Sequence, residues 1–493
     1  MHTSASPTDP ASASRESVRL RADLYAFLGQ YPLRLEGPLD DDTSLIAAGV
    51  LDSLALFNLV LWVEKQIGQS VNPTSTDLAR EWDTVRLILR FIEESASRGA
   101  RGDAAVISRG SGQRTRALRI VEYSSEHREA IASLQTRLWS PDAELNRKYL
   151  EWKYESNPYG NEPRIYLALE GDEVLAMRGF YPSYWEFGPQ PRRRVLHVAD
   201  DLLVRDDHRG RGLVNFLMQA ACHDLERRGI DYLLNLSGSP FTVESSIATG
   251  WKSAGALNPM DRCSRSQRRR NELRRVLART PLMWRYAASP WLSSSAERHP
   301  FARLDRLPEV LPGKDGMPVH VSRQAMPTAM ASLVRRIGHD QRIRHVRDQT
   351  YFEWRLKNPL HDYRFLYVGK PELDGYMILK RTIDKGGVSP RVSIVDLEAV
   401  DPRTRDVLLQ CGTRQDLFEE LFVWSATLPK ESQEALSIAG FRPLDQSPLG
   451  QGNRKILVRP TDDTRLTEDW HIDGIRMLEF ANWDMRMIYS MAG

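Results

Sequence analysis

The sequence predicts an α+β protein in which a small helical bundle is followed by two α/β lobes in tandem. Three observations indicate this. The N-terminal part contains apolar helical segments, the middle part alternates strand-like and helical segments, and a short pattern of the middle part returns about 200 residues later. At 493 residues the chain is too long for one core, so about three domains are expected.

The charge is unevenly distributed along an otherwise ordinary globular composition. Residues 15–94 carry 13 acidic and 8 basic side chains, a net charge of −5. Because the whole chain carries +3, the remainder carries +8. An acidic module joined to a basic body indicates that the two attract each other or that the body binds phosphate groups.

Several classes of protein are not expected. The three cysteines are scattered and odd in number, so no disulfide framework is predicted. Residues 1–14 lack the apolar core of a signal peptide, and no run of the sequence is apolar enough to span a membrane. We expect a disordered tail over residues 1–14, no membrane partner and a cytoplasmic protein. The sequence shows no metal-ligand spacing and no Ser-His-Asp order, so no metal is predicted.

Residues 15–97 have the periodicity of a four-helix bundle. Ser53 stands where the chain enters the apolar helix over residues 54–67. One interpretation is that Ser53 is only a helix cap. The other is that it carries a phosphodiester, which would face the free N–H groups and the positive end of the helix.

The order of motifs in this bundle favours the second interpretation. This part of the chain resembles the acyl and peptidyl carrier proteins in four successive motifs. They are Asp-Asp-Thr-Ser-Leu, Gly-Val-Leu-Asp-Ser-Leu, Leu-Val-Leu-Trp-Val-Glu and Trp-Asp-Thr-Val. The resemblance implies 4′-phosphopantetheine on Ser53, a phosphopantetheinyl transferase that attaches it, and a ligase that charges it with an acyl or aminoacyl group. Residues 98–115 are predicted to be a flexible linker. Because tethering raises the local concentration of the carrier, we expect a partner active site in the same chain.

A possible phosphate site follows in the next part of the chain. The expected strand 195–204 leads through Arg209, Gly210, Arg211 and Gly212 into the expected helix 213–228. The N–H groups of such a turn and its arginines can hold a phosphate, although basic glycine turns are often only solvated loops. The other expected elements are strands over 118–123, 165–169, 174–181 and 232–236 and a helix over 128–138.

This order of elements, followed by Gly250-Trp251, resembles the GNAT acyltransferase superfamily. Arg209 and Gly212 match its phosphate loop, whose last small residue is replaced by Val214 here. The resemblance implies a mixed-sheet acyltransferase lobe over residues 116–258 that binds coenzyme A or acyl-CoA, or a single pantetheine phosphate. It also implies a backbone N–H donor to the thioester carbonyl near Leu203 or Val204. The family often has a tyrosine acid at the position of Ser246.

Transfer to an amine also requires a base, for which His197, Asp200 and Asp201 on the strand are candidates. Strand alternation predicts that Asp200 and Asp201 point to opposite faces of the sheet. The alternative is that one is an edge charge and the other the partner of an arginine. Asn235, at the end of the next strand, can bind the pantetheine amides or simply form part of a turn.

The second lobe is predicted from a repeat. Tyr-Leu-Glu-Trp-Lys at residues 149–153 returns as Tyr-Phe-Glu-Trp-Arg at 351–355, and we interpret this element as a structural bracket rather than a catalytic one. Residues 396–405 lack a glycine turn, so the lobe over 318–460 is predicted to be a degenerate GNAT-like unit that walls off the substrate cleft. Tandem lobes of this kind resemble N-myristoyltransferases and Fem-type aminoacyl transferases. Residues 259–317 are expected to be a basic connector and 461–493 a tail packed on the second lobe.

These observations together predict an N-acyltransferase of secondary metabolism. The acyl or aminoacyl group on the Ser53 arm would be passed to an amine of a small-molecule acceptor. One alternative is acylation of the arm, or of an aminoacyl group on it, from acyl-CoA. Another alternative is a Fem-like transferase that uses aminoacyl-tRNA and binds the RNA through the arginines of residues 262–279. The fourth interpretation is that the protein is not an enzyme and that both lobes serve as docking scaffolds for the carrier.

Overall fold

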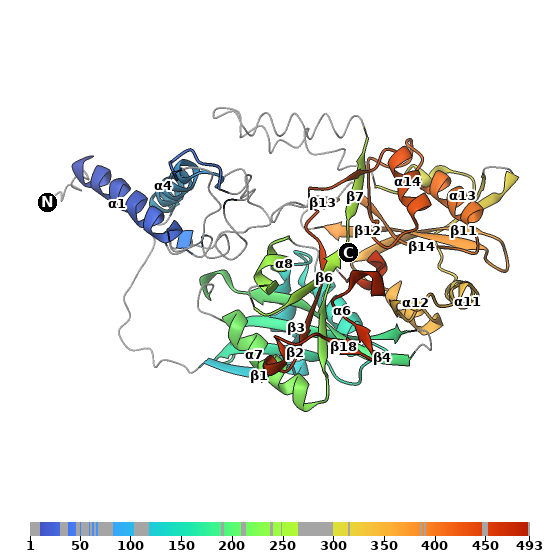
Figure 1. Ribbon diagram of the computed structural model, residues 1–493, viewed down its shortest axis with the longest axis horizontal. Helices are drawn as coiled ribbons and strands as arrows, with labels where there is room; N and C mark the ends of the chain where they lie inside the picture. The colour runs from blue at the N-terminus through green and yellow to red at the C-terminus, as the bar shows by residue number, and fades with distance from the viewer. Residues whose placement is uncertain are drawn as a thin grey trace.

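Two mixed β-sheets form the body of the protein, and a helical region precedes them (Figure 1). None of the described helices is long and apolar enough to cross a bilayer. The computed structural model describes residues 10–29, 38–45, 50, 59, 62–63, 66–67, 82–102, 118–188, 192–208, 213–236, 240–247, 249–264, 299–313, 316–384, 387–388, 391–445 and 452–491.

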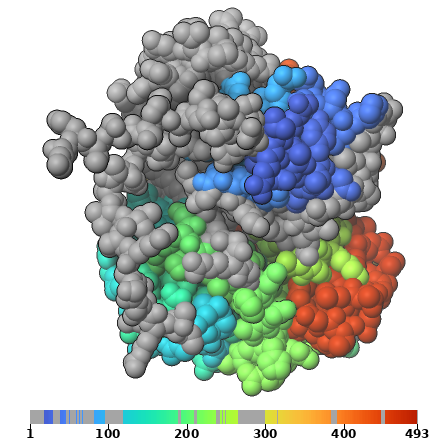
Figure 2. All heavy atoms as spheres, turned by 90° about the vertical axis from the view of Figure 1, so that its left-hand side faces the viewer, coloured from blue at the N-terminus to red at the C-terminus, as the bar shows by residue number. Residues whose placement is uncertain are grey.

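The helical region has a core of its own. Helices α1 (Pro10–Leu28) and α4 (Val85–Gly102) lie side by side, and Figure 2 shows the described residues of this region gathered on one face of the molecule, in blue. Residues 59, 62, 63, 66 and 67 are helical as well. The core consists of Leu24, Leu28, Leu45, Val50, Leu59, Val63, Trp82, Val85, Ile88 and Ile92.

Acidic residues of the loop after α1 connect the two helices. Asp41 accepts a hydrogen bond from Tyr25 Oη of α1 at 2.7 Å, and Asp42 accepts one from Arg86 Nε of α4 at 2.7 Å. Both helices are longer than the sequence predicts, because α1 begins inside the expected tail and α4 runs into the expected linker. Once a helix is nucleated by packing, each further Ala, Ser, Glu or Arg adds a backbone hydrogen bond at little cost. The other two helices of the predicted bundle involve positions outside the described residues.

The first sheet has the order β1-β2-β3-β4-β5-β17-β6 and matches the strands predicted between residues 118 and 236. Helices α5 (Arg128–Leu134) and α6 (Ala143–Leu150) pack on one face, and α7 (Leu213–Arg227) packs on the other. The strands are β1 (Leu118–Glu122), β2 (Arg164–Glu170), β3 (Glu173–Phe187), β4 (Arg192–Val204), β5 (Tyr232–Asn235), β6 (Lys252–Ala256) and β17 (Lys455–Pro460).

The second sheet has the order β16-β7-β15-β14-β12-β11-β9-β8, and α13 (Pro402–Gly412) covers one of its faces. Helices α11 (Pro327–Ile337) and α12 (Gln349–Arg355) lie on the other side, in the core that both lobes share. The strands are β7 (Pro259–Cys263), β8 (Val310–Pro312), β9 (Pro318–Ser322), β11 (His361–Val368), β12 (Gly375–Asp384), β14 (Arg391–Ala399), β15 (Glu420–Trp424) and β16 (Arg442–Pro443).

The two sheets exchange strands, which the predicted domain boundaries do not allow. Strand β17, placed by the sequence in the second lobe, lies between β5 and β6 of the first sheet. Strand β7, placed in the basic connector, lies between β15 and β16 of the second sheet. Its Arg262 is buried and donates to the Arg414 carbonyl at 3.3 Å, so it does not belong to a solvated basic face. A short strand fits either sheet by pattern alone, and only the tertiary pairing decides between them.

The repeated element joins the lobes. Trp152 and Trp354 stack with ring centroids 4.9 Å apart and an angle of 13° between the rings. Each indole Nε1 donates to the backbone carbonyl of the other tryptophan, at 2.8 and 2.9 Å. Both side chains are buried, so the pair combines a large apolar contact with reciprocal hydrogen bonds. The structure therefore gives this element the bracketing role that the sequence predicts.

The C-terminal tail packs on both lobes rather than on the second lobe alone. Its Asp473 is 2.9 Å from Arg194 of β4, and Lys252 of β6 lies over the ring of Trp470. Strand β20 (Trp483–Asp484) pairs with β10 (Ile343–His345), which in turn pairs with β3. The tail thus follows the junction between the lobes, because its tryptophans and methionines find apolar surface on both sides of it.

We predict that Trp152→Ala lowers the free energy of unfolding of the full chain by about 3–5 kcal/mol, because it opens a cavity and leaves Trp354 without its partner. Urea unfolding followed by fluorescence measures this. Phe216→Ala removes an aromatic ring that is 52% exposed on α7 and is the control. Its effect should stay within about 0.5 kcal/mol. Equal unfolding midpoints for the two variants would contradict the bracketing role.

Candidate functional site

The first sheet opens into a fork between β4 and β5. The two strands run parallel and pair only at His197–Leu233 and Val198–Leu234. Beyond this point β4 continues to pair with β3, with an irregularity opposite Met177 to Gly179, while β5 ends at Asn235. A fork of this kind exposes backbone N–H groups in a slot between the strands. The predicted donors Leu203 and Val204 lie on β4 past the irregularity.

A buried lysine sits beside the fork and binds both candidate carboxylates. Lys153 Nζ is 2.8 Å from Asp200 Oδ2 and 3.0 Å from Asp201 Oδ2. Asp201 also accepts hydrogen bonds from Tyr154 Oη and Trp139 Nε1, both at 2.7 Å. The side chains of Lys153 and Asp201 are fully buried, whereas that of Asp200 is 12% exposed. Of the two carboxylates, Asp200 is therefore the one that a substrate can reach.

The prediction that the two carboxylates point to opposite faces is wrong. Asp201 has a left-handed backbone with φ of 51°, and its N–H donates to Asp200 Oδ1 at 3.0 Å. This break in the strand alternation turns both side chains toward Lys153. Gly179, opposite Asp200 on β3, makes room for the cluster. A Cβ at this position would lie 1.9 Å from Tyr154 Oη.

The electrostatics of the cluster combine burial with ion pairing. Burial raises the pKa of Asp201, and the positive charge of Lys153 opposes that rise. For Lys153, burial lowers the pKa, but the attraction of Asp200 and Asp201 outweighs it and the pKa is raised overall. Lys153 therefore stays charged, and Asp201 has the surroundings of a structural partner rather than of a proton acceptor.

His197, the third base candidate, lies at the last paired position of the fork. Its side chain is buried, and its Nδ1 has no hydrogen-bond partner in the part of the chain that the structure describes. Burial, followed by repulsion from Arg164, lowers the pKa of His197 to about 4. The imidazole is thus neutral near pH 7, which suits a proton acceptor, but it does not contact the Lys153 cluster through any hydrogen bond among the described residues.

The other arm of the fork brings two predicted residues together. Asn235 Nδ2, at the end of β5, donates to Ser246 Oγ of α8 (Pro240–Ile247) at 3.1 Å. Both residues are buried. The hydroxyl of Ser246 is therefore held at the position where the resembled family often has its tyrosine acid.

Two of the predicted sites lie outside the described residues. These are Ser53 and the loop of Arg209, Gly210, Arg211 and Gly212. The elements on either side of the loop are in place, since β4 ends at Val204 and α7 begins at Leu213. The arginines of the connector between residues 265 and 279 are likewise outside the described part.

The second lobe also has a buried carboxylate beside its fork, but the side chains that bind it differ from those in the first lobe. Asp396 of β14 lies next to the irregularity in its pairing with β12, and Leu397 N–H donates to its Oδ1 as in the first lobe. Its partners are Arg347 at 3.0 Å and Tyr376 at 2.8 Å. Arg486 of the tail lies 3.7 Å from the same carboxylate, whose side chain is fully buried. The acid of the second lobe is thus enclosed by cations.

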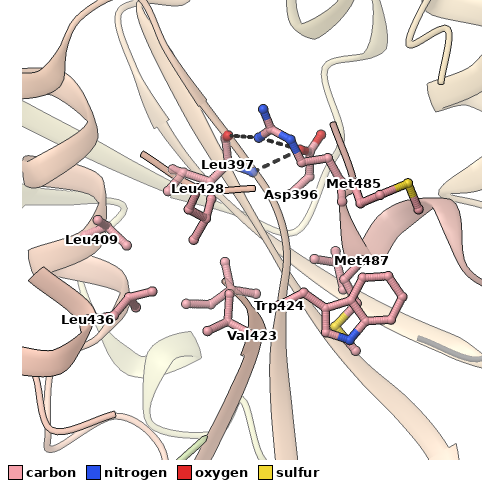
Figure 3. A pocket seen from close by; sticks show the side chains of 12 residues that line it. Asp396, Leu397, Leu409, Val423, Trp424, Leu428, Leu436, Met485 and Met487 are labelled. Carbon is pink, nitrogen blue, oxygen red and sulfur yellow. Dashed lines mark hydrogen bonds and ion pairs between the residues drawn. The ribbon is translucent and has the colours of Figure 1, made fainter. Parts of the chain in front are cut away.

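A small apolar cavity marks the fork of the second lobe (Figure 3). Strands β14 and β15 pair as far as Ile394–Val423 and then separate. Figure 3 shows Trp424, Met485 and Met487 among the side chains that line this cavity. The opening between the strands is therefore lined mainly by apolar side chains, two of them from the C-terminal tail.

The start of α13 also differs from a phosphate site. Pro402 is the first residue of the helix, and the carboxylate of Asp401 accepts a hydrogen bond from the Thr404 N–H at 2.7 Å. A phosphate would have to displace this negative charge from the N–H groups that it needs. This arrangement supports the prediction that the second lobe is degenerate.

One group of potential metal ligands lies away from the fork. Ligand atoms of Asp261, Cys263 and Glu420 are within 4.8 Å of one another on the second sheet. Arg391 Nε is 2.5 Å from Glu420 and supplies a positive charge there. We assign no metal to this group.

Sequence reasoning missed Lys153, Trp139 and Tyr154. The signal for Lys153 was a lysine inside the aromatic segment Tyr149 to Tyr154, where a solvated side chain is unexpected. The structure places it in a π-helical turn over Glu151–Glu155, which directs it into the core beside the fork.

Residues 128–242 match the acetyltransferase (GNAT) family, and this segment contains the fork and the Lys153 cluster. The match identifies an acyltransferase domain in the first lobe, and the protein is an acyltransferase. No curated protein matches the sequence.

Three solved structures are similar to this chain at low sequence identity. A probable N-acyltransferase from Enterococcus faecalis V583 has 11% identity, a TM-score of 0.44, and coverage of 70% of this chain and 72% of that one. A GCN5-related N-acetyltransferase from Kribbella flavida has 13% identity and a TM-score of 0.43, and the match covers 70% of this chain and 71% of that one. A tandem GNAT protein from the clavulanic acid biosynthesis pathway has 11% identity and a TM-score of 0.41, and the match covers 70% of this chain and 99% of that one. Likeness at this level does not bear on function.

We predict that His197 makes the protein sensitive to acid. With a folded pKa of about 4 and an ordinary value of 6.5, the unfolded chain binds more protons between these limits. Stability is therefore lost as the pH falls from 6.5 to 4, by about 3 kcal/mol from this residue. His197→Gln should remove that part of the loss in urea unfolding at pH 7 and pH 4. His471→Gln, at an exposed position, is the control, and equal acid sensitivity of both variants would contradict the prediction.

Proposed function

We propose that the protein is an N-acyltransferase of secondary metabolism. It transfers an acyl or aminoacyl thioester from a 4′-phosphopantetheine arm on Ser53 to an amine of a small-molecule acceptor. The observation that carries the proposal is the position of Asp200, a partly exposed carboxylate at the β4/β5 fork of a segment that matches the GNAT family.

The geometry of the fork supports this chemistry. A thioester in the slot would present its carbonyl to the backbone N–H groups of β4 near Leu203 and Val204. The acceptor amine attacks the carbonyl carbon, a C–N bond forms and the C–S bond breaks. Asp200 accepts the proton that the nitrogen loses, directly or through one water. The sulfur leaves on the β5 side, where the Ser246 hydroxyl is held by Asn235.

Three features support the carrier as donor. The motifs around Ser53 resemble carrier proteins, the helical region has its own apolar core, and the acidic loop Asp40–Ser44 ties its helices together. A donor on the same chain reaches the fork at high effective concentration. The proposal requires a phosphopantetheinyl transferase and an acyl- or aminoacyl-activating ligase as partners.

Acyl-CoA is the alternative donor, and the family match favours it. In this case the loop Arg209–Gly212 holds the pyrophosphate, and the acyl group goes to the carrier arm or to an aminoacyl group on it. The two donors require different residues. Transfer from the arm depends on Ser53, whereas transfer from acyl-CoA to a free amine does not.

The first test is the intact mass of the full chain after co-expression with a broad-specificity phosphopantetheinyl transferase. We expect a phosphopantetheine increment that Ser53→Ala abolishes. Ser44→Ala, which keeps Ser53 and removes a loop hydroxyl, is the matched control and should retain the increment. An unmodified wild-type chain, or an increment that persists in Ser53→Ala, refutes the carrier as donor. Saturable acyl-CoA binding by that chain would then support the alternative.

The second test loads the arm with an acyl group and follows its release to a panel of primary amines. Asp200→Asn should slow release by roughly 10²- to 10⁴-fold, the range for loss of a general base. Asp172→Asn, at an exposed position in the β2–β3 turn, should leave the rate unchanged. Urea unfolding of Asp200→Asn checks that the fork is intact. An unchanged rate in this variant removes Asp200 from the mechanism.

A further inference from the structure

Lys153 joins the two carboxylates of the fork through a single ammonium group. Its Nζ donates to Asp200 Oδ2 at 2.8 Å and to Asp201 Oδ2 at 3.0 Å, and its side chain is fully buried. Four aromatic rings surround the same ammonium, with centroids 5.1–5.5 Å from Nζ, and they belong to Trp139, Tyr149, Tyr154 and Tyr181. The carboxylates and the ring faces both favour a positive charge at this position.

The two carboxylates differ in how many of their acceptor positions the protein uses. An ionised carboxylate offers about four such positions. Among the described residues, Asp201 accepts three hydrogen bonds, from Lys153 and two aromatic side chains, and its side chain is fully buried. Asp200 accepts two, from Lys153 and from the Asp201 N–H, and its side chain is 12% exposed. An amine can therefore reach acceptor positions on Asp200 and none on Asp201.

The shared lysine decides the charge of this acid pair. Both Oδ2 atoms contact the same Nζ, so the two carboxylates are close neighbours. Two buried carboxylates at such close range do not both ionise without a cation beside them, and one of them keeps a proton. A protonated Asp200 cannot accept a further proton. The positive charge of Lys153 removes this competition, because it compensates one of the two negative charges.

Other ionisable groups around the cluster do not replace the lysine. Burial, together with the negative charge of the carboxylates, raises the pKa of Tyr149, Tyr154 and Tyr181 well above the ordinary value, so the three phenols stay neutral. Arg178 of β3 and Arg355 of α12 also act on groups of the cluster. Neither arginine forms an ion pair with the two acids in the part of the chain that the structure describes.

The repeated element allows a comparison within the chain. Arg355 occupies the position in the second copy that Lys153 occupies in the first. Its guanidinium donates to the carbonyls of Ile488 and Ser490 in the tail, while Arg347 holds the acid of the second lobe. That acid is fully buried. Of the two described forks, only the first combines a shared lysine with a partly exposed acid, and it is the fork in the segment that matches the acyltransferase family.

We propose that Lys153 is a positioning residue for the transfer, which holds Asp200 toward the opening of the fork and keeps it in the deprotonated form that accepts the proton of the amine. The proposal rests on the amine transfer proposed above and adds a residue that acts through its base. Lys153 touches neither acceptor nor thioester, because its side chain is fully buried. Asp201 completes the arrangement, since its negative charge helps to keep the lysine protonated.

The first test compares pH profiles of acyl release to one primary amine in the wild type, Lys153→Met, Asp201→Asn and the double variant. Without the lysine charge, the acidic limb should move to higher pH by roughly 1–3 units. Asp201→Asn removes the competing negative charge, so its limb should move to lower pH. The double variant restores the net charge of the cluster, and its limb should return toward that of the wild type. Lys148→Met, at an exposed position of α6, should match the wild type.

The second test uses urea unfolding of the same chains and needs no transfer. In folded Lys153→Met, the acid pair keeps about one proton that the unfolded chain has released above about pH 5. The stability of this variant relative to the wild type should therefore fall as the pH rises from 5 to 7. Adding Asp201→Asn should largely remove this dependence. If Lys153→Met does not fold, the pH profiles of Asp201→Asn and the double variant decide.

The pattern across the variants separates a charge effect from a merely structural one. Equal acidic limbs in the wild type and Asp201→Asn overturn the proposal. A double variant that is no closer to the wild type than Lys153→Met also overturns it, because removal of an acid does not repair lost packing. If the unfolding experiment gives the expected proton but no chain transfers an acyl group, the proposed reaction is refuted, whereas the control of the Asp200 charge by Lys153 is supported.

Discussion

The exchange of β7 and β17 between the two sheets is the constraint on which the rest of the body depends. Because β17 lies against β5, one arm of the fork is held by a strand from the far end of the chain. The other arm, β4, is held by the long β3 hairpin. The stacked Trp152 and Trp354 lock the junction with reciprocal hydrogen bonds. The lobes therefore share strands and a common core, and each arm of the fork is paired with a further strand on its outer side.

The two forks show how one architecture gives one open and one closed site. In the first lobe, Lys153 organises Asp200 and Asp201 but leaves Asp200 partly exposed. In the second, Arg347 and Arg486 enclose Asp396, and two methionines of the tail line the cavity at the fork. Asp401 occupies the helix start that a phosphate would need. The fork of the second lobe is thus surrounded by internal contacts.

The buried charges beside the two forks are of both signs. Lys153 pairs with Asp200 and Asp201 in the first lobe, and Arg347 and Arg486 surround Asp396 in the second. Charges in a poorly solvated region act over longer distances than on the surface. Each of these buried acids therefore depends on an opposite charge nearby, because an unpaired buried charge is costly.

The sequence by itself determined the strands and helices of the first lobe, the repeat that joins the lobes, and the candidate residues of the fork, because these depend on local periodicity and short motifs. The direction of Asp201 depended on a left-handed backbone, which alternation does not predict. The partner of the acid pair, Lys153, comes from another element 47 residues away from Asp200. The membership of β7 and β17 was decided by tertiary pairing alone, since a short strand is compatible with either sheet.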